Sequence, residues 1–284
     1  MSTVALGSPA LPRDPFAPPR KTRSVSQLKQ YERCPYAYKL ARLDRAWQRP
    51  AAWLPQGSAV HAAIEAWERS GRTMDLEAVQ AVYREEFAKE IASYTALTPN
   101  FEWWSKSGPY AAKRDIPRRW DIGLDQCEKY LRWAEANEHE EIWIAPDGTP
   151  GIELRFEMNL DGVVVLGFID AIIERWTSDG RRKELVVRDH KTGNQPGDDF
   201  QLGVYAVAIA DAYGVEQPTV GDYWMGKSGK ATYPYDLTDW TREAVTRKFH
   251  ELEENLQAER FEPNPSTETC KFCDVATSCE FRAA

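Results

Sequence analysis

Two carboxylates and a lysine near the middle of the chain, Asp170, Asp189 and Lys191, are the side chains best suited to do chemistry together. If they lie on two strands joined by a two-residue turn at Asp179-Gly180, Asp170 is directly opposite Asp189. Side chains opposite each other in an antiparallel pair have Cβ atoms about 4.5–5.5 Å apart, and like charges there are destabilising unless a cation compensates them. Lys191 shares the face of Asp189, whereas the His190 side chain points to the other face.

This trio favours metal-assisted hydrolysis of a phosphodiester. Carboxylate oxygens are the ligands that Mg²⁺ and Mn²⁺ prefer, and the bound metal polarises the phosphate and generates hydroxide from water. The lysine would position that water or stabilise the developing charge. The same pairing rule at the Asp161-Gly162 turn places Glu153 on this face, where it could bind the metal through water. The alternative is a solvated strand face with an ordinary salt bridge, and the spacing alone leaves both interpretations open.

The elements that must position these side chains indicate an α/β fold. Apolar and polar residues alternate from residue 151 onwards, which predicts three strands in an antiparallel meander. The second strand is expected from Val163 to Trp176 and the third from Glu184 to Lys191. The other predicted elements are helices over 24–32, 57–70, 76–94, 113–136, 198–213 and 240–258, and short strands over 222–225 and 231–236. We therefore expect a mixed central sheet flanked by helices, with an N-terminal helical region.

Two residue pairs on the predicted helices could join the carboxylates. His61 and Glu65 are one turn apart on a helix expected to start just after Pro55 and Gly57, so His61 could be a third metal ligand. The alternative is a partly buried histidine with an ordinary hydrogen bond, which is the more common situation. Gln201 and Tyr205 share one face of the helix that follows the third strand, but this pair alone says little about function.

In combination these residues resemble a known family. Gly57-x-x-x-His61, Gly167-Phe168-Ile169-Asp170, Asp189-His190-Lys191-Thr192-Gly193 and Gln201-x-x-x-Tyr205 occur in the order and spacing of the PD-(D/E)XK nuclease superfamily. Within it, the chain is most similar to the RecB-type exonucleases and the related CRISPR-adaptation nucleases. The resemblance covers about Ser24 to Cys279 and leaves residues 98–120 unmatched.

The resemblance implies a role for each matching residue. His61, Asp170 and Asp189 would bind Mg²⁺ or Mn²⁺ together with the backbone carbonyl of His190, and Lys191 would be the catalytic lysine. Gln201 and Tyr205 would contact the DNA strand or order the site. The chain departs from the family at Asp189, where a glutamate is more frequent, and the pattern tolerates this change.

Four of the five cysteines indicate a second metal-dependent element. Cys270, Cys273 and Cys279 lie within ten residues near the C-terminus, and Cys34 is the natural fourth ligand. A structural zinc ion and an iron–sulfur cluster are both compatible with four thiolates. One distant cysteine followed by a C-terminal trio resembles the [4Fe–4S] cluster of the same nuclease branch, which favours the cluster over zinc. Either group would clamp the two ends of the chain together, whereas Cys127 is expected in the core.

A segment rich in aromatic and basic residues, 101–120, is a candidate DNA-binding surface. Such a mixture suits single strands, because bases stack on aromatic rings while cations bind phosphates. The alternative is that the tryptophans pack in the core and the charges are solvated. A second basic contact is expected at the turn that contains Lys227 and Lys230. The segment contains Trp103, Trp104, Tyr110 and Trp120 together with Lys106, Lys113, Arg114, Arg118 and Arg119.

The chain as a whole has 284 residues and a formal net charge of -8, so any nucleic-acid surface must be local. Five prolines before residue 20 predict a disordered tail over residues 1–21, followed by one nuclease domain over 22–284. No apolar run is long enough to span a membrane, and no secretion signal is expected, which favours a cytoplasmic protein.

The function expected from these features is metal-dependent DNA exonuclease activity, on single strands or DNA ends, in recombination, repair or phage DNA metabolism. Two alternatives stay open: a CRISPR-adaptation-type endonuclease or exonuclease, and a non-catalytic iron–sulfur DNA-binding module. No helicase activity is expected of this chain, so unwinding would require a helicase or recombination partner.

Overall fold

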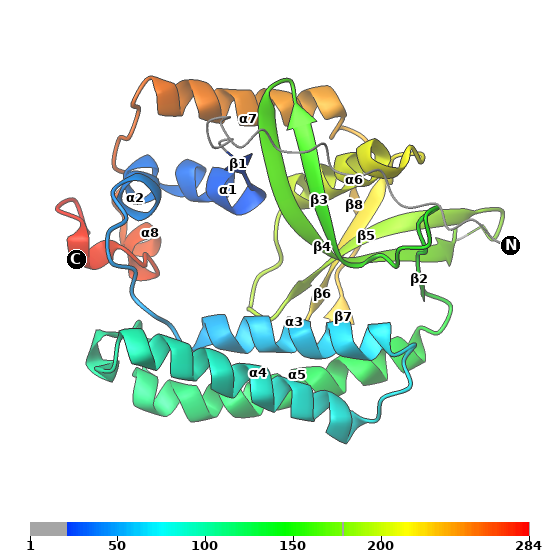
Figure 1. The fold of residues 1–284 in the computed structure, drawn as a ribbon, viewed down its shortest axis with the longest axis horizontal. Coiled ribbons are helices and arrows are strands. Elements are labelled where there is room, and N and C mark those ends of the chain that lie inside the picture. Colours follow the sequence, from blue (N-terminus) through cyan, green and yellow to red (C-terminus); the bar gives the residue numbers. More distant parts are fainter. Residues whose placement is uncertain (1–21, 178, 284) are drawn as a thin grey trace, which may run out of the picture.

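A single mixed sheet forms the centre of the protein, whose computed structural model describes residues 22–177 and 179–283 (Figure 1). The main order of strands is β1-β4-β5-β6-β7, with β2 and β3 also paired to β4 and β8 paired to β6. The strand bounds are β1 Thr22–Arg23, β2 Glu141–Ile142, β3 Ile152–Leu160, β4 Val163–Trp176, β5 Lys183–Lys191, β6 Val220–Met225, β7 Lys230–Ala231 and β8 Tyr235–Asp236. The predicted tail, 1–21, lies outside the described residues.

The three predicted strands of the meander are present as β3, β4 and β5, and each neighbouring pair is antiparallel. The register also matches the prediction, because Leu160 pairs with Val163 and Ala171 pairs with Arg188. The turn between β4 and β5 differs from the expected two-residue loop. The backbone N–H of Thr177 donates to the Arg182 carbonyl at 2.8 Å, so the turn is wider but keeps the same register.

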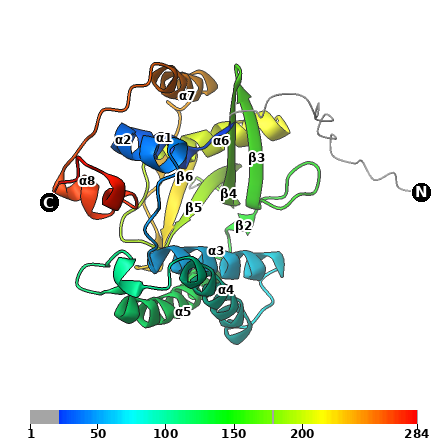
Figure 2. The same cartoon turned by 60° about the vertical axis from the view of Figure 1, so that its left-hand side comes forward.

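Helices cover the sheet from two sides (Figures 1 and 2). Helices α1, α6 and α7 pack with β3, β4 and β5 around the larger apolar core, which includes Leu28, Phe156, Ile169, Ile209 and Phe249. Helices α3, α4 and α5 form a separate bundle with its own core, into which Trp224 of β6 projects. The helix bounds are α1 Val25–Arg33, α2 Pro35–Tyr38, α3 Trp53–Arg69, α4 Leu76–Leu97, α5 Ala112–Ala136, α6 Asp199–Tyr213, α7 Arg242–Gln257 and α8 Thr267–Lys271. Short π and 3₁₀ segments are η1 Lys39–Leu43, η2 Phe101–Trp103 and η3 Ala276–Ser278.

The local sequence explains where the helices beside the site begin. Ser24 caps α1 by accepting from the Gln27 N–H at 3.2 Å, and Asp198 caps α6 by accepting from the Gln201 N–H at 3.3 Å. Helix α3 begins at Trp53, four residues earlier than predicted. Pro55 is compatible with this start because its missing N–H falls in the first turn, where backbone N–H groups have no helical partner. Among the described residues, no helix is long and apolar enough to cross a membrane.

Candidate active site

The first part of the candidate site gathers around Asp170, at the point where β4 leaves its pairing with β5. Asp170 Oδ2 accepts a hydrogen bond from the backbone N–H of His190 at 2.6 Å. Nδ1 of His61, from α3, lies 3.4 Å from Asp170 Oδ1 and 3.4 Å from Glu153 Oε1, while its Nε2 lies 3.0 Å from the His190 carbonyl oxygen. His61, Asp170 and Glu153 are therefore neighbours, as the pairing rule predicts for the carboxylates. Glu65 is directed elsewhere and pairs with Arg69 at 2.7 Å.

The second part of the site gathers around Gln201, in the first turn of α6. Its Nε2 donates to Asp189 Oδ1 and to the Tyr205 hydroxyl, the latter at 2.8 Å. Its Oε1 accepts from Lys191 Nζ at 3.3 Å. Lys191 Nζ also lies 2.6 Å from Asp189 Oδ2. The predicted residues Asp189, Lys191, Gln201 and Tyr205 are thus brought together by one amide group.

The electrostatics of the two aspartates differ. Burial and the negative charge of Asp170 raise the pKa of Asp189 to about 6, against the opposing effect of Lys191. Burial would also raise the pKa of Asp170, but the charge and hydrogen bond of His61 outweigh it, so the pKa of Asp170 is lowered. Burial opposes protonation of His61, yet Asp170 and Glu153 raise its pKa well above the ordinary value. The carboxylates of the site therefore carry more negative charge than the neighbouring cations offset.

The residues present fit a divalent metal ion. A ring nitrogen of His61, a carboxylate oxygen of Asp170 and a ring nitrogen of His190 lie within 4.8 Å of one another, and Asp189 is not part of this group. Oδ2 of the buried Asp189 has the Lys191 ammonium at 2.6 Å and, among the described residues, no further polar partner. A carboxylate oxygen with one cationic neighbour keeps lone-pair capacity for a metal ion. The His190 ring itself faces Tyr130 and Trp224, on the side away from Lys191 as predicted, and burial lowers its pKa to about 3.

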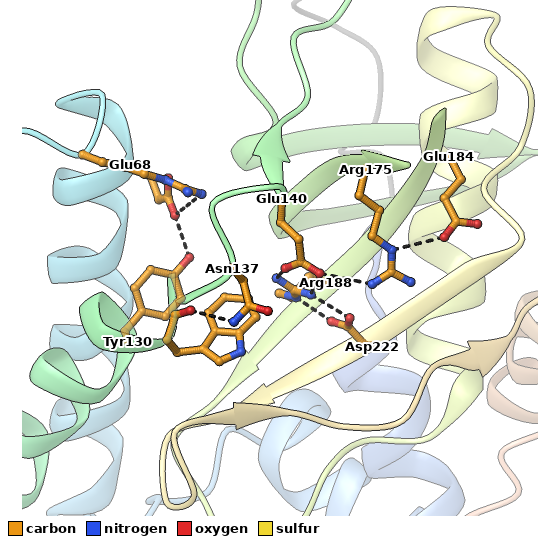
Figure 3. A network of polar contacts seen from close by, with 10 residues as sticks. Glu68, Tyr130, Asn137, Glu140, Arg175, Glu184, Arg188 and Asp222 are labelled. Carbon is orange, nitrogen blue, oxygen red and sulfur yellow. Dashed lines mark hydrogen bonds and ion pairs between the residues drawn. The ribbon is translucent and has the colours of Figure 1, made fainter. Parts of the chain in front are cut away.

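A buried arginine of β5, Arg188, connects this strand to its neighbours through charged side chains (Figure 3). Arg188 Nε donates to Asp222 Oδ1 at 2.6 Å and its Nη1 donates to Glu140 Oε2 at 2.7 Å. Its guanidinium also lies 4.4 Å from the centre of the Trp133 ring. Glu140 in turn accepts from Arg175, so the network connects β4, β5 and β6 to the segment after α5. It holds the backbone on which Asp189 and Lys191 are carried.

A second buried network supports the turn that follows Lys191. Gln126 Nε2 donates to the Thr192 carbonyl at 3.0 Å, and the Gln126 Oε1 accepts from Gln56. The Gln56 Oε1 accepts from Arg119 at 2.9 Å. Gly57 lies directly beside this turn, because an added Cβ there would be 3.3 Å from the Thr192 hydroxyl. Sequence reasoning missed this network, and the only signal for it was the glycine at position 57.

The four cysteines of the predicted clamp line one pocket between α1, α2 and the C-terminal segment. Cys34 caps the end of α1, and its Sγ accepts a hydrogen bond from the Asn264 backbone N–H at 3.4 Å. Among the described residues, no three cysteine sulfur atoms lie within 4.8 Å of one another. A tetrahedral zinc ion with Zn–S bonds of about 2.3 Å needs a closer group. Cys127 is buried in the bundle core, as predicted.

In the segment 101–120, some aromatic rings pack in the core and others are exposed to solvent. Trp104 is 2% exposed and is not available for base stacking, whereas Trp120 is only partly buried against the bundle core. Arg118 and Arg119 both pair with the buried Asp115, and the Arg118 side chain is still 37% exposed. Trp103 is 58% exposed and remains accessible. The stacking surface predicted from sequence is therefore wrong for Trp104, because aromatic type alone does not distinguish a core ring from a surface ring.

Comparison with known proteins defines the class. The family model of the PD-(D/E)XK nuclease superfamily matches residues 22–280, and the chain therefore belongs to this superfamily. Its mixed sheet flanked by helices is the fold expected from the resemblance.

Two relatives come from mycobacterial phages. The Gene 69 protein of Mycobacterium phage D29 is 56% identical over 264 residues, which cover 90% of this chain and 96% of the phage protein. The Gene 69 protein of Mycobacterium phage L5 is 52% identical over 283 residues, which cover 90% and 95% of the two chains. Among solved structures, a putative exonuclease from Eubacterium rectale matches with a TM-score of 0.48 and 13% identity, over 91% of this chain and 88% of that one.

Proposed function

We propose that the protein is a metal-dependent DNA exonuclease that hydrolyses phosphodiester bonds of single-stranded DNA or of DNA ends. The observation that carries the proposal is the convergence of His61, Asp170, Asp189 and Lys191 at the end of β5, in a chain of a nuclease superfamily. Phage relatives support a role in phage recombination, repair or DNA metabolism. The proposal includes a cytoplasmic location, one nuclease unit over 22–284 and an unwinding partner.

In this proposal, the carboxylates of Asp170 and Asp189, the His61 ring and the His190 carbonyl hold Mg²⁺ or Mn²⁺. When bound, the metal polarises the phosphate and lowers the pKa of water. Lys191 has three N–H donors, of which one faces Asp189 and one faces Gln201, so the third is free for a phosphate oxygen or for water. Gln201 orients Asp189 and Lys191, and Tyr205 orients Gln201.

For the cysteines, the proposal is a [4Fe–4S] cluster held by Cys34, Cys270, Cys273 and Cys279. Two observations support it: the four side chains line one pocket, and Asn264 donates to Cys34 as backbone N–H groups do to cluster thiolates. A cluster also tolerates wider sulfur spacing than a single ion, because several iron atoms lie between the thiolates. Cys273→Ser should lower the folding yield and abolish the brown visible absorption of anaerobically purified protein. A well-folded, fully active Cys273→Ser variant without that absorption would contradict a structural cluster.

The test of catalysis uses anaerobically purified protein, Mn²⁺ and single-stranded DNA labelled at its 5′ or 3′ end. Wild type should degrade the strand and Lys191→Ala should not, with the first label released giving the polarity. Circular DNA without ends separates the alternatives, because an exonuclease leaves it intact and a CRISPR-adaptation-type endonuclease cuts it. Binding without cleavage by both proteins would contradict the catalytic proposal and favour the non-catalytic iron–sulfur module.

A further inference from the structure

A second lysine reaches the active site from a distant part of the chain. Lys29 lies in the middle of α1, and its Nζ contacts Gln201 Oε1 at 3.3 Å and Asp198 Oδ1 at 2.8 Å. No motif includes this residue, and 172 positions separate it from Gln201. We infer that Lys29 is a second phosphate-binding residue, which holds the DNA strand at a phosphate adjacent to the one that is cleaved. The inference rests on the proposed nuclease function.

The geometry pairs Lys29 with the catalytic lysine. Lys191 Nζ lies 3.3 Å from the same Gln201 oxygen, so the two ammonium groups are no more than twice that distance apart. Each makes one ion pair with an aspartate and one contact with the shared amide oxygen. An ammonium has three donors, and each lysine therefore keeps one for a further acceptor. The Lys29 and Lys191 side chains are 27% and 29% exposed, which leaves both accessible to a ligand.

The charges around Gln201 favour an anionic ligand. Two ammonium groups this close repel each other. The negative charges of Asp189 and Asp198 offset this repulsion only while neither carboxylate binds another cation. In the proposed mechanism Asp189 binds the metal, so metal binding leaves the Lys29 and Lys191 pair with surplus positive charge. Phosphate groups of a nucleic-acid strand supply the matching negative charge.

A purely structural role explains Lys29 less well. Asp198 already has a structural function, because it caps α6 through the Gln201 N–H. Its side chain is 57% exposed, and an ion pair with so exposed a carboxylate contributes little stability. The Lys29 ammonium is thus held beside Gln201 by weak contacts, with which a phosphate group can compete.

The test measures the salt dependence of DNA binding, which a structural role would not change. Fluorescence anisotropy of a labelled single-stranded oligothymidylate is recorded from 50 to 200 mM NaCl, with Ca²⁺ in place of Mg²⁺ and with recovery of uncut DNA checked. Loss of one phosphate contact reduces the slope of log K against log salt by about 0.7 for a single strand. The ratio of the DNA affinity of wild type to that of Lys29→Ala should therefore fall about threefold between 50 and 200 mM NaCl. Lys29→Arg, which keeps the charge, should retain the wild-type slope.

Lys183→Ala is the matched control. Lys183 is also paired with a carboxylate, Glu174 at 2.6 Å, but it lies at the opposite end of β5 and should leave the slope unchanged. Steady-state cleavage should show a raised KM for Lys29→Ala with a smaller change in kcat. A wild-type slope in Lys29→Ala, or an equal loss in Lys183→Ala, would overturn the Lys29 inference and spare the nuclease proposal. Failure of wild type to bind DNA would overturn both.

Discussion

Arg188 and Asp189 are neighbours in β5, and both are buried and charged, yet their surroundings differ. Arg188 has two carboxylate partners, Glu140 and Asp222, which outweigh the effect of burial and raise its pKa further above the ordinary value. Asp189 faces another carboxylate, Asp170, and its pKa is raised to about 6 because burial and that charge disfavour ionisation. Arg188 is fully paired within the protein, whereas the pKa of Asp189 stays raised despite its ion pair with Lys191 and its hydrogen bond from Gln201, so a further cation would stabilise its charge.

This difference teaches how a structural charge is distinguished from a functional one. A buried charge that has all its partners positions the backbone, and its removal disturbs folding. A buried charge whose partners do not offset burial and repulsion reduces stability and is retained where binding or catalysis requires it. The comparison therefore predicts opposite effects for substitutions at two consecutive positions.

The largest effect is expected from Asp189→Asn, on activity. The amide keeps the size of the side chain and removes the proposed metal-binding charge, so cleavage should fall by about 10³-fold, as for loss of a key electrostatic group. Thermal stability should stay the same or rise, because repulsion of Asp170 disappears. Cleavage rates with Mn²⁺ and the melting temperature measure the two effects. Nearly normal cleavage would remove Asp189 from the metal site.

The second effect is expected from Arg188→Met, on stability. Glu140 and Asp222 would be left buried without their partner, which costs about 3–5 kcal/mol. The melting temperature should then drop by at least about 6 °C for a chain of this size. Adding Glu140→Gln and Asp222→Asn should recover part of the loss, because no unpaired charge remains. An unchanged melting temperature in Arg188→Met would contradict the structural role that distinguishes Arg188 from Asp189.

The smallest effect concerns pH. Because the pKa of Asp189 is raised to about 6, this group is protonated below that value and charged above it. Metal must displace the proton, so Mn²⁺ affinity should fall at least about tenfold for each pH unit below 6, and the raised pKa of His61 acts in the same direction. The electron paramagnetic resonance signal of free Mn²⁺ measures this affinity. A pH dependence as steep in Asp189→Asn as in wild type would assign the proton to another group.

Local patterns in the sequence predict much of this architecture. An apolar run between two turn signals predicts the bounds of β4 as they stand in the structure, Val163–Trp176, and the Asp161-Gly162 turn determines the register of β3. The contacts of Arg188 and Lys29 could not be predicted in the same way. Their partners lie 34 to 172 positions away, and residue type does not reveal which distant charge will face them. Burial of Trp104 depends likewise on how the segment around η2 packs.

Helix α1 carries one residue of each of two proposed sites. Lys29 occupies its middle and Cys34 its end, five positions or about 7.5 Å further along the axis. Three residues of the same helix, Val25, Leu28 and Tyr31, are buried in the larger apolar core, which fixes the helix against the sheet. The carboxylates of the proposed metal site belong to the sheet itself, whereas Lys29 and Cys34 both belong to this packed helix. The contact of Lys29 with Gln201 therefore depends on how α1 is packed and not on the register of β4 and β5.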